Sequence, residues 1–115
     1  MTKDPQVYLE HILQSIELIE RYVQGRTLEE FLESVPLQDQ VIRRIEIIGE
    51  AARNLPGELT AKYPDVPWAR IVAMRNILIH VYFGVDLELA WRVATRDAGT
   101  LKQSIQGILR DLTGV

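Results

Sequence analysis

The chain has no cysteine among its 115 residues. Disulfide frameworks, thiolate metal sites and cysteine nucleophiles are therefore excluded, and the absence fits a reducing compartment. No apolar run reaches the roughly 18 residues of a membrane span. The first residues, MTKDPQVYLEHI, lack the apolar segment of a signal peptide. We therefore expect a cytoplasmic protein without a membrane segment.

An excess of positive charge is also absent, because 13 lysines and arginines face 16 aspartates and glutamates, for a formal net charge of −3. Nucleic-acid binding by the whole surface normally requires a strongly basic protein. Only a local basic patch could bind nucleic acid here. Apolar residues, in contrast, make up 47% of the chain. This content and length predict one domain, residues 1–115, with a substantial core.

Helical periodicity dominates, and no segment sustains the alternation of a strand. Candidate caps mark helix starts: Asp4 before Pro5, Thr27 with Glu30 three residues later, and Asp86. Prolines and glycines mark helix ends. The expected helices cover residues 5–24, 28–34, 37–55, 58–62, 67–83 and 87–112. Four long helices with brief connections predict an all-α antiparallel helical bundle.

The segment WARIVAMRNILIHVYFGVD (residues 68–86) places four polar groups in an apolar helix: Arg75, Asn76, His80 and Tyr82. Unpaired buried polar groups are costly, so these residues are either satisfied structurally or form a site. At about 100° per residue, Arg75 and Tyr82 share one face, and Asn76 and His80 share the adjacent face. Arg75 and His80 differ by roughly 140° in direction. They converge only if the helix loosens near His80 or a second chain completes the site.

These residue types suit cleavage of an RNA phosphodiester. A histidine that titrates near neutral pH can take the proton of a 2′-hydroxyl or protonate the leaving 5′-oxygen. The forked, always-charged guanidinium of Arg75 can hold the phosphate and the charge that builds on it. Asn76 can fix the imidazole tautomer or contact the phosphate. This chemistry requires no metal.

A structural role is the alternative. In it, Arg75 pairs with a bundle carboxylate such as Glu46 or Glu50, and His80 is a hydrogen-bonded core residue. Residue types alone favour this alternative, because an R-x4-H spacing arises easily by chance. Glu46 and Glu50 lie four residues apart and could also ligate a metal, but no histidine follows a glutamate by three positions. A salt bridge to an arginine is the simpler expectation for both.

The stretch RNILIHVY, residues 75–82, resembles the R-x4-H-x-Y motif of HepT-like proteins in the HEPN superfamily. The resemblance continues in VYLEHILQSIELIE near the start, in VIRRIEIIGEAARNLP in the middle and in the final helix. It covers essentially the whole chain in the family's usual order. Around residues 97–100 the family often has proline where this chain reads DAGT, which leaves the continuity of the final helix open.

The resemblance implies an all-α HEPN-type bundle that forms a homodimer and cuts RNA without metal or cofactor. Arg75 and His80 take the catalytic positions, and Asn76 takes the polar position after the arginine. The protein would be the toxin of a bacterial or archaeal type VII-like toxin–antitoxin pair. Its antitoxin, an MntA-type nucleotidyltransferase, would add AMP to Tyr82, and the added phosphate would repel RNA. Both tRNA and mRNA stay open as targets.

Other residues support weaker expectations. Four further arginines could supply a local RNA-binding patch, although a solvated helix surface is simpler for each: Arg43, Arg44, Arg53 and Arg70. We expect His11 on a surface or packing face, and Trp68 and Trp91 as packing anchors rather than base-stacking platforms. Two other functions stay open: a non-catalytic partner of a nucleotidyltransferase, and a dimerisation module in which the motif is structural.

Overall fold

The structure is a computed structural model that describes the backbone of residues 4–79 and 86–114, and the side chains of those ranges except at 76–79. Within these ranges all regular structure is helical, which confirms the all-α prediction. The elements are α1 (Pro5–Val23), α2 (Leu28–Glu33), α3 (Val35–Arg53), α4 (Gly57–Ala61), α5 (Trp68–Ile79), α6 (Leu87–Arg92), the π-helical η2 (Val93–Asp97) and α7 (Ala98–Thr113).

Side-chain caps set the starts of several helices. Asp4 accepts a hydrogen bond from the amide two residues later, at 2.9 Å. Thr27 accepts from the amide of Glu30 at 3.2 Å, which confirms it as the cap of α2. The Glu30 carboxylate accepts from the Thr27 hydroxyl at 3.3 Å, whereas in a full capping box it would accept from the Thr27 amide. Asp86 caps α6 through the amide three residues later, at 3.2 Å. α3 begins two residues before the predicted position, because Ser34 caps it.

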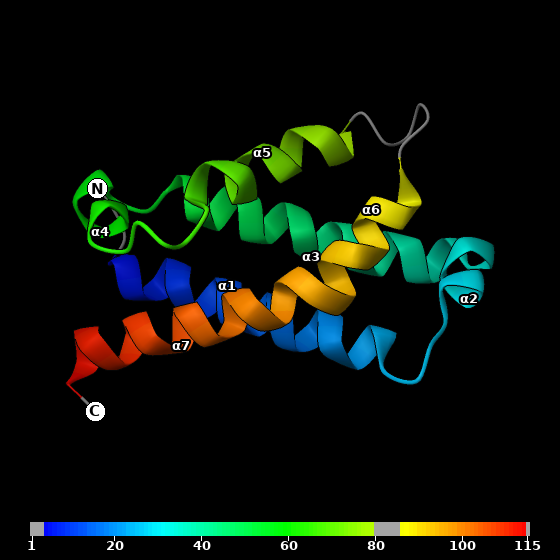
Figure 1. The fold of residues 1–115 in the computed structure, drawn as a ribbon, viewed down its shortest axis with the longest axis horizontal. Helices are drawn as coiled ribbons and strands as arrows, with labels where there is room; N and C mark the ends of the chain where they lie inside the picture. The colour runs from blue at the N-terminus through cyan, green and yellow to red at the C-terminus, as the bar shows by residue number, and fades with distance from the viewer. Residues whose placement is uncertain (1–3, 80–85, 115) are drawn as a thin grey trace.

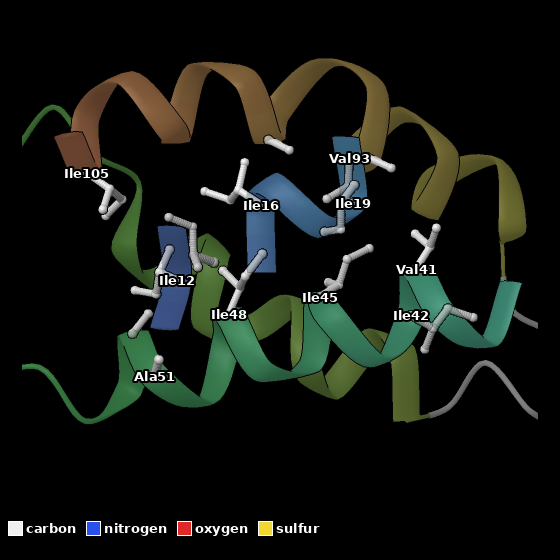
Figure 2. Close-up of a cluster of buried hydrophobic side chains, with 14 of the residues drawn as sticks. Ile12, Ile16, Ile19, Val41, Ile42, Ile45, Ile48, Ala51, Val93 and Ile105 are labelled. Carbon is white, nitrogen blue, oxygen red and sulfur yellow. The ribbon is translucent and has the colours of Figure 1, made fainter. Parts of the chain in front are cut away.

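The long helices run antiparallel to their neighbours, as Figure 1 shows. α3 packs against both α1 and α5, and α7 packs on α1. Buried aliphatic side chains fill the space between α1, α3 and α7 (Figure 2), among them Ile12, Ile16, Ile19, Ile45 and Ile105. Full burial of one such side chain is worth about 1.5–3 kcal/mol. The α1–α3 pair is therefore the scaffold on which α5 rests.

Aromatic residues attach the shorter elements to this scaffold. Phe31 of α2 is fully buried, and its ring centroid lies 5.3 Å from that of Trp91 in α6. Trp68 donates its indole N–H to the carbonyl of Tyr63 at 3.1 Å and so fastens the start of α5. Both tryptophans make packing contacts, as predicted from the sequence.

The last part of the chain follows one helical path from Leu87 to Thr113, with no non-helical residue between α6, η2 and α7. This settles the continuity that the DAGT stretch left open. The π-helical turn of η2 locally widens the helix, and the path changes direction between α6 and α7 (Figure 1). Across residues 4–79 and 86–114, no helix combines the length and apolar character needed to cross a membrane.

Candidate functional site

α5 carries the candidate site, and a glycine in α3 brings the two helices close together there. Ile71 and Arg75 are one turn apart on α5 and face Gly49 of α3. A Cβ atom built on Gly49 would lie 3.1 Å from the Cβ of Arg75 and 3.2 Å from the carbonyl oxygen of Ile71. Real Cβ contacts are seldom so short. The backbone of α5 at Arg75 therefore rests directly on α3.

The guanidinium of Arg75 forms an ion pair across this contact. Its Nη1 atom lies 2.7 Å from Oε2 of Glu50. The pair lacks the alignment of a hydrogen bond, although Oε2 itself is shielded from solvent. The short distance between opposite charges defines the contact. The structural alternative predicted that Arg75 pairs with Glu46 or Glu50, and the structure shows Glu50 as the partner.

The ion pair leaves part of the Arg75 side chain exposed to solvent. That side chain remains 34% exposed, and the Glu50 side chain remains 47% exposed. A guanidinium offers five N–H donors, of which the carboxylate faces one corner. About a third of the Arg75 side chain is therefore in contact with solvent beside the ion pair.

Glu50 belongs to what we call the α3 charged strip: Arg43, Glu46, Glu50 and Arg53, each three or four residues from the next. Arg43 lies 3.6 Å from Glu46, and Arg53 lies 3.8 Å from Glu50. Both arginines are more than half exposed. Because α3 and α5 are antiparallel (Figure 1), the Arg43 end of the strip lies toward the C-terminal end of α5.

The other two candidate RNA-binding arginines lie elsewhere. Arg44 is half-buried and projects about 100° around α3 from Arg43. Arg70 is exposed and lines a cavity of about 270 Å³ bordered by α1, α3, α5 and the η2–α7 segment. The cavity wall is largely aliphatic, and Asp65 and Asp97 also line it. Of the four predicted arginines, the structure groups Arg43 and Arg53 in the strip beside Arg75.

The rest of the motif falls outside the described residues. His80 and Tyr82 lie in the segment 80–85, and the side chain of Asn76 is likewise not described. The α5 backbone is helical through Ile79, directly before His80. The roles of Asn76, His80 and Tyr82 therefore remain predictions.

Metal ligation has no support from the two glutamates, because Glu46 and Glu50 face arginines. Over the described portion of the chain, no group of three or more histidine, cysteine, aspartate or glutamate side chains is placed to hold a metal ion. His11 is exposed on α1, as one of its two predicted roles required. The close contact at Gly49 was not predicted from the sequence, although a glycine inside the helical run IEIIGEAA is a recognisable signal of close packing.

Comparison with known proteins shows the family of the chain. The family described as Ribonuclease HepT-like matches residues 12–108. The chain belongs to the HepT-like ribonuclease family. The matched region of this HepT-like chain contains the whole RNILIHVY segment and both helices that form the Arg75–Glu50 pair.

Relatives of this HepT-like chain occur in bacteria and archaea. It is 41% identical to "Putative RNase TTE0752" of Caldanaerobacter subterraneus, with 94% of this chain and 96% of that protein aligned. It is 41% identical to "Probable ribonuclease HepT" of Thermococcus cleftensis, with 89% and 93% aligned. It is 54% identical to "Gamma-glutamylcyclotransferase and putative RNase MJ0434" of Methanocaldococcus jannaschii, where it spans 50% of the relative's length. No solved structure gives a significant match.

Proposed function

We propose that the protein is a metal-independent RNA endonuclease in which Arg75 and His80 carry the reaction. The family match across the entire R-x4-H-x-Y segment carries this proposal. The partial exposure of the Arg75 side chain supports it, since an arginine that binds RNA must be in contact with solvent in the free protein. The RNase names of the aligned relatives agree with this activity.

The proposed reaction is an internal transesterification. The imidazole of His80 takes the proton of the 2′-hydroxyl, and the 2′-oxygen attacks the adjacent phosphorus. The bond from phosphorus to the 5′-oxygen breaks, and that oxygen takes up a proton from a general acid. The products are a 2′,3′-cyclic phosphate and a 5′-hydroxyl. Arg75 stabilises the negative charge that builds on the phosphate oxygens, and Asn76 orients the imidazole.

We further propose that the working site lies between two copies of the chain. Arg75 and His80 point about 140° apart on a straight helix, and the helical backbone of α5 continues to Ile79. A two-fold axis beside α5 would bring two arginines and two histidines into one cleft. Arg75 of each chain would then work with His80 of the other chain, which gives two equivalent sites per dimer.

Regulation through Tyr82 completes the proposal. Seven residues from Arg75, Tyr82 shares its helical face if α5 continues in register. AMP attached to the tyrosine hydroxyl would place a phosphate beside the arginine that must bind RNA. The enzyme that adds it would be a nucleotidyltransferase antitoxin, and this protein would be the toxin. Intact mass spectrometry with and without that partner tests for adenylyl groups on Tyr82.

The decisive test of the activity uses two substitutions. Arg75→Ala and His80→Ala should each abolish RNA cleavage and growth inhibition, whereas a chelator should leave the parent protein active. Arg92→Ala is the matched control, because Arg92 is an exposed arginine on α6. Cleavage that persists at the parental rate in both variants would overturn the proposal.

The Arg75–Glu50 ion pair favours a structural role for Arg75, which fits either of two competing functions: a dimerisation module or a non-catalytic partner of a nucleotidyltransferase. In that case the purified protein would not cut RNA. Arg75→Ala would lower the melting temperature and disrupt the dimer. His80→Ala would leave binding to a nucleotidyltransferase intact. Measuring cleavage, melting and complex formation on the same variants separates the two functions.

A further inference from the structure

Glu50 stands out because its two carboxylate oxygens have different surroundings. The side chain as a whole is 47% exposed, yet Oε2 is shielded from solvent. This oxygen lies 2.7 Å from Nη1 of Arg75 and 3.8 Å from Nη1 of Arg53. A carboxylate oxygen withdrawn from water needs a cation beside it. The shorter distance identifies Arg75 as the main partner.

The backbone around this pair is fixed. Gly49, the residue before Glu50, brings α3 into close contact with α5 at Arg75. The carbonyl oxygen of Glu50 accepts a hydrogen bond from the side-chain amide of Asn54 at 2.8 Å. Both ends of the ion pair therefore project from helices that are packed against each other, and the carboxylate limits where the guanidinium can point.

We propose that Glu50 is a positioning residue for Arg75, resting on the RNA endonuclease function proposed above. Its carboxylate holds one corner of the guanidinium and directs the remaining N–H donors toward the phosphate of the RNA. The long arginine side chain has many rotamers, and a misplacement of about 1 Å in a catalytic group can cost about 100-fold in rate. Glu50 also places a negative charge near the bound phosphate, which weakens RNA binding.

These two effects oppose each other and give a distinctive kinetic signature. Glu50→Gln removes the charge with little change in shape. Arg75 then loses its anchor, so kcat should fall about tenfold or more. RNA should bind about two- to fivefold more tightly because the repulsion is gone, so KM should fall as well. A residue that only maintained the fold would not lower kcat and KM together.

Two further variants sharpen the test. Glu46→Gln is the matched control, because Glu46 lies one turn away on the same strip and faces Arg43. It should keep the parental kcat. Glu50→Asp keeps the charge but shortens the arm, so it should restore part of the kcat that Glu50→Gln loses. Melting temperatures of all three should stay close to the parent, since the pair is partly exposed.

The outcomes separate this proposal from the one on which it rests. Parental cleavage that depends on Arg75, combined with an unchanged kcat in Glu50→Gln, would overturn the positioning role alone. Equal loss of kcat in Glu46→Gln would also overturn it, since the effect would then belong to the strip as a whole. Absence of any Arg75-dependent cleavage in the parent would overturn both.

Discussion

Gly49 determines how far the Arg75 side chain must reach. Glycine inside a helix normally costs roughly 0.5–1 kcal/mol relative to alanine, because it has more conformational freedom to lose. At this position the missing Cβ leaves room for the Cβ of Arg75 and the carbonyl oxygen of Ile71, at 3.1 and 3.2 Å from where it would stand. One of these neighbours is backbone, so it can move only if α5 moves.

Alanine at two glycines should separate helix propensity from contact. Gly107→Ala in α7 should stabilise the fold by about 0.5–1 kcal/mol, because its Cβ would meet only the end of Arg110 at 3.8 Å. Gly49→Ala should gain less than this or lose stability, since the neighbours must give way. Chemical denaturation of both variants gives the comparison. An equal gain in the two would show that α5 does not press on α3.

Gly49→Ala should also impair catalysis if the proposed function holds. Displacing α5 from α3 lengthens the distance between Arg75 and Glu50, which are 2.7 Å apart in the parent. Cleavage by Gly107→Ala, in contrast, should match the parent. Each variant adds one methyl group, so comparing their stability and RNA cleavage isolates the effect of the contact between Gly49 and α5.

Between elements, two side-chain contacts tie α7 to the rest of the bundle. Lys102 donates a hydrogen bond to Glu20 of α1 at 2.9 Å, and the hydroxyl of Tyr63 donates to Asp111 at 2.8 Å. The hydrogen bond to Glu20 raises the pKa of Lys102 above its ordinary 10.5; burial opposes the rise, and the charges of Glu20 and Glu17 add to it. The hydrogen bond to Asp111 raises the pKa of Tyr63, with burial and the Asp111 charge in support.

The sign of the resulting pH dependence follows from these directions. A group whose pKa is higher in the folded state stabilises the fold fully below its unfolded pKa and loses that contribution as pH rises through its folded pKa. The melting temperature should therefore be level between about pH 7 and pH 9 with respect to these groups and decline above about pH 10. Lys102→Gln should melt lower than the parent at about pH 8, and the difference should shrink above pH 10.

The control for this effect is Gln103→Ala, an exposed neighbour that does not titrate. It should follow the pH profile of the parent. A difference between Lys102→Gln and the parent that persists unchanged to high pH would contradict the role of the Lys102–Glu20 hydrogen bond.

At the same scale, helix boundaries were the most predictable feature. Asp4, Thr27 and Asp86 cap the helices for which they were predicted, because a cap depends on bonds within three residues. The π-helical turn of η2 was not predicted, because a stretch of five residues such as VATRD carries no distinct period. Local signals were sufficient for the starts of α1, α2 and α6 and insufficient for the start of α3 and for the widening at η2.

The ion-pair partner of Arg75 shows where sequence reasoning stops. Glu46 and Glu50 lie four residues apart on one face of α3, so both were candidates. Choosing between them requires the axial offset of α5 against α3, and Gly49 determines that offset through its close contact with Arg75. No pattern within one helix encodes such an offset. The sequence therefore predicted the type of contact and left its register open.

At the scale of the molecule, α5 is attached to one side of the bundle. Its packing partner is α3, and a cavity of about 270 Å³ separates it from η2 and α7. The candidate site therefore sits on an outer helix of the chain, where a second copy can reach it. This placement suits an active site that two chains share.

Mixing two inactive variants tests the shared site directly. If Arg75 of one chain works with His80 of the other, a dimer of Arg75→Ala and His80→Ala chains has one intact site and one doubly altered site. Random exchange makes half of the dimers mixed, so co-refolding equal amounts should restore about a quarter of the parental cleavage. If Arg75 and His80 act within one chain, every site in the mixed dimer lacks one residue and cleavage stays absent.

Refolding Arg75→Ala with a chain that carries both substitutions must restore nothing, which excludes contaminating nuclease. An inactive mixture in which mixed dimers are detected by native mass spectrometry would contradict the shared site and would require α5 to loosen near His80 instead.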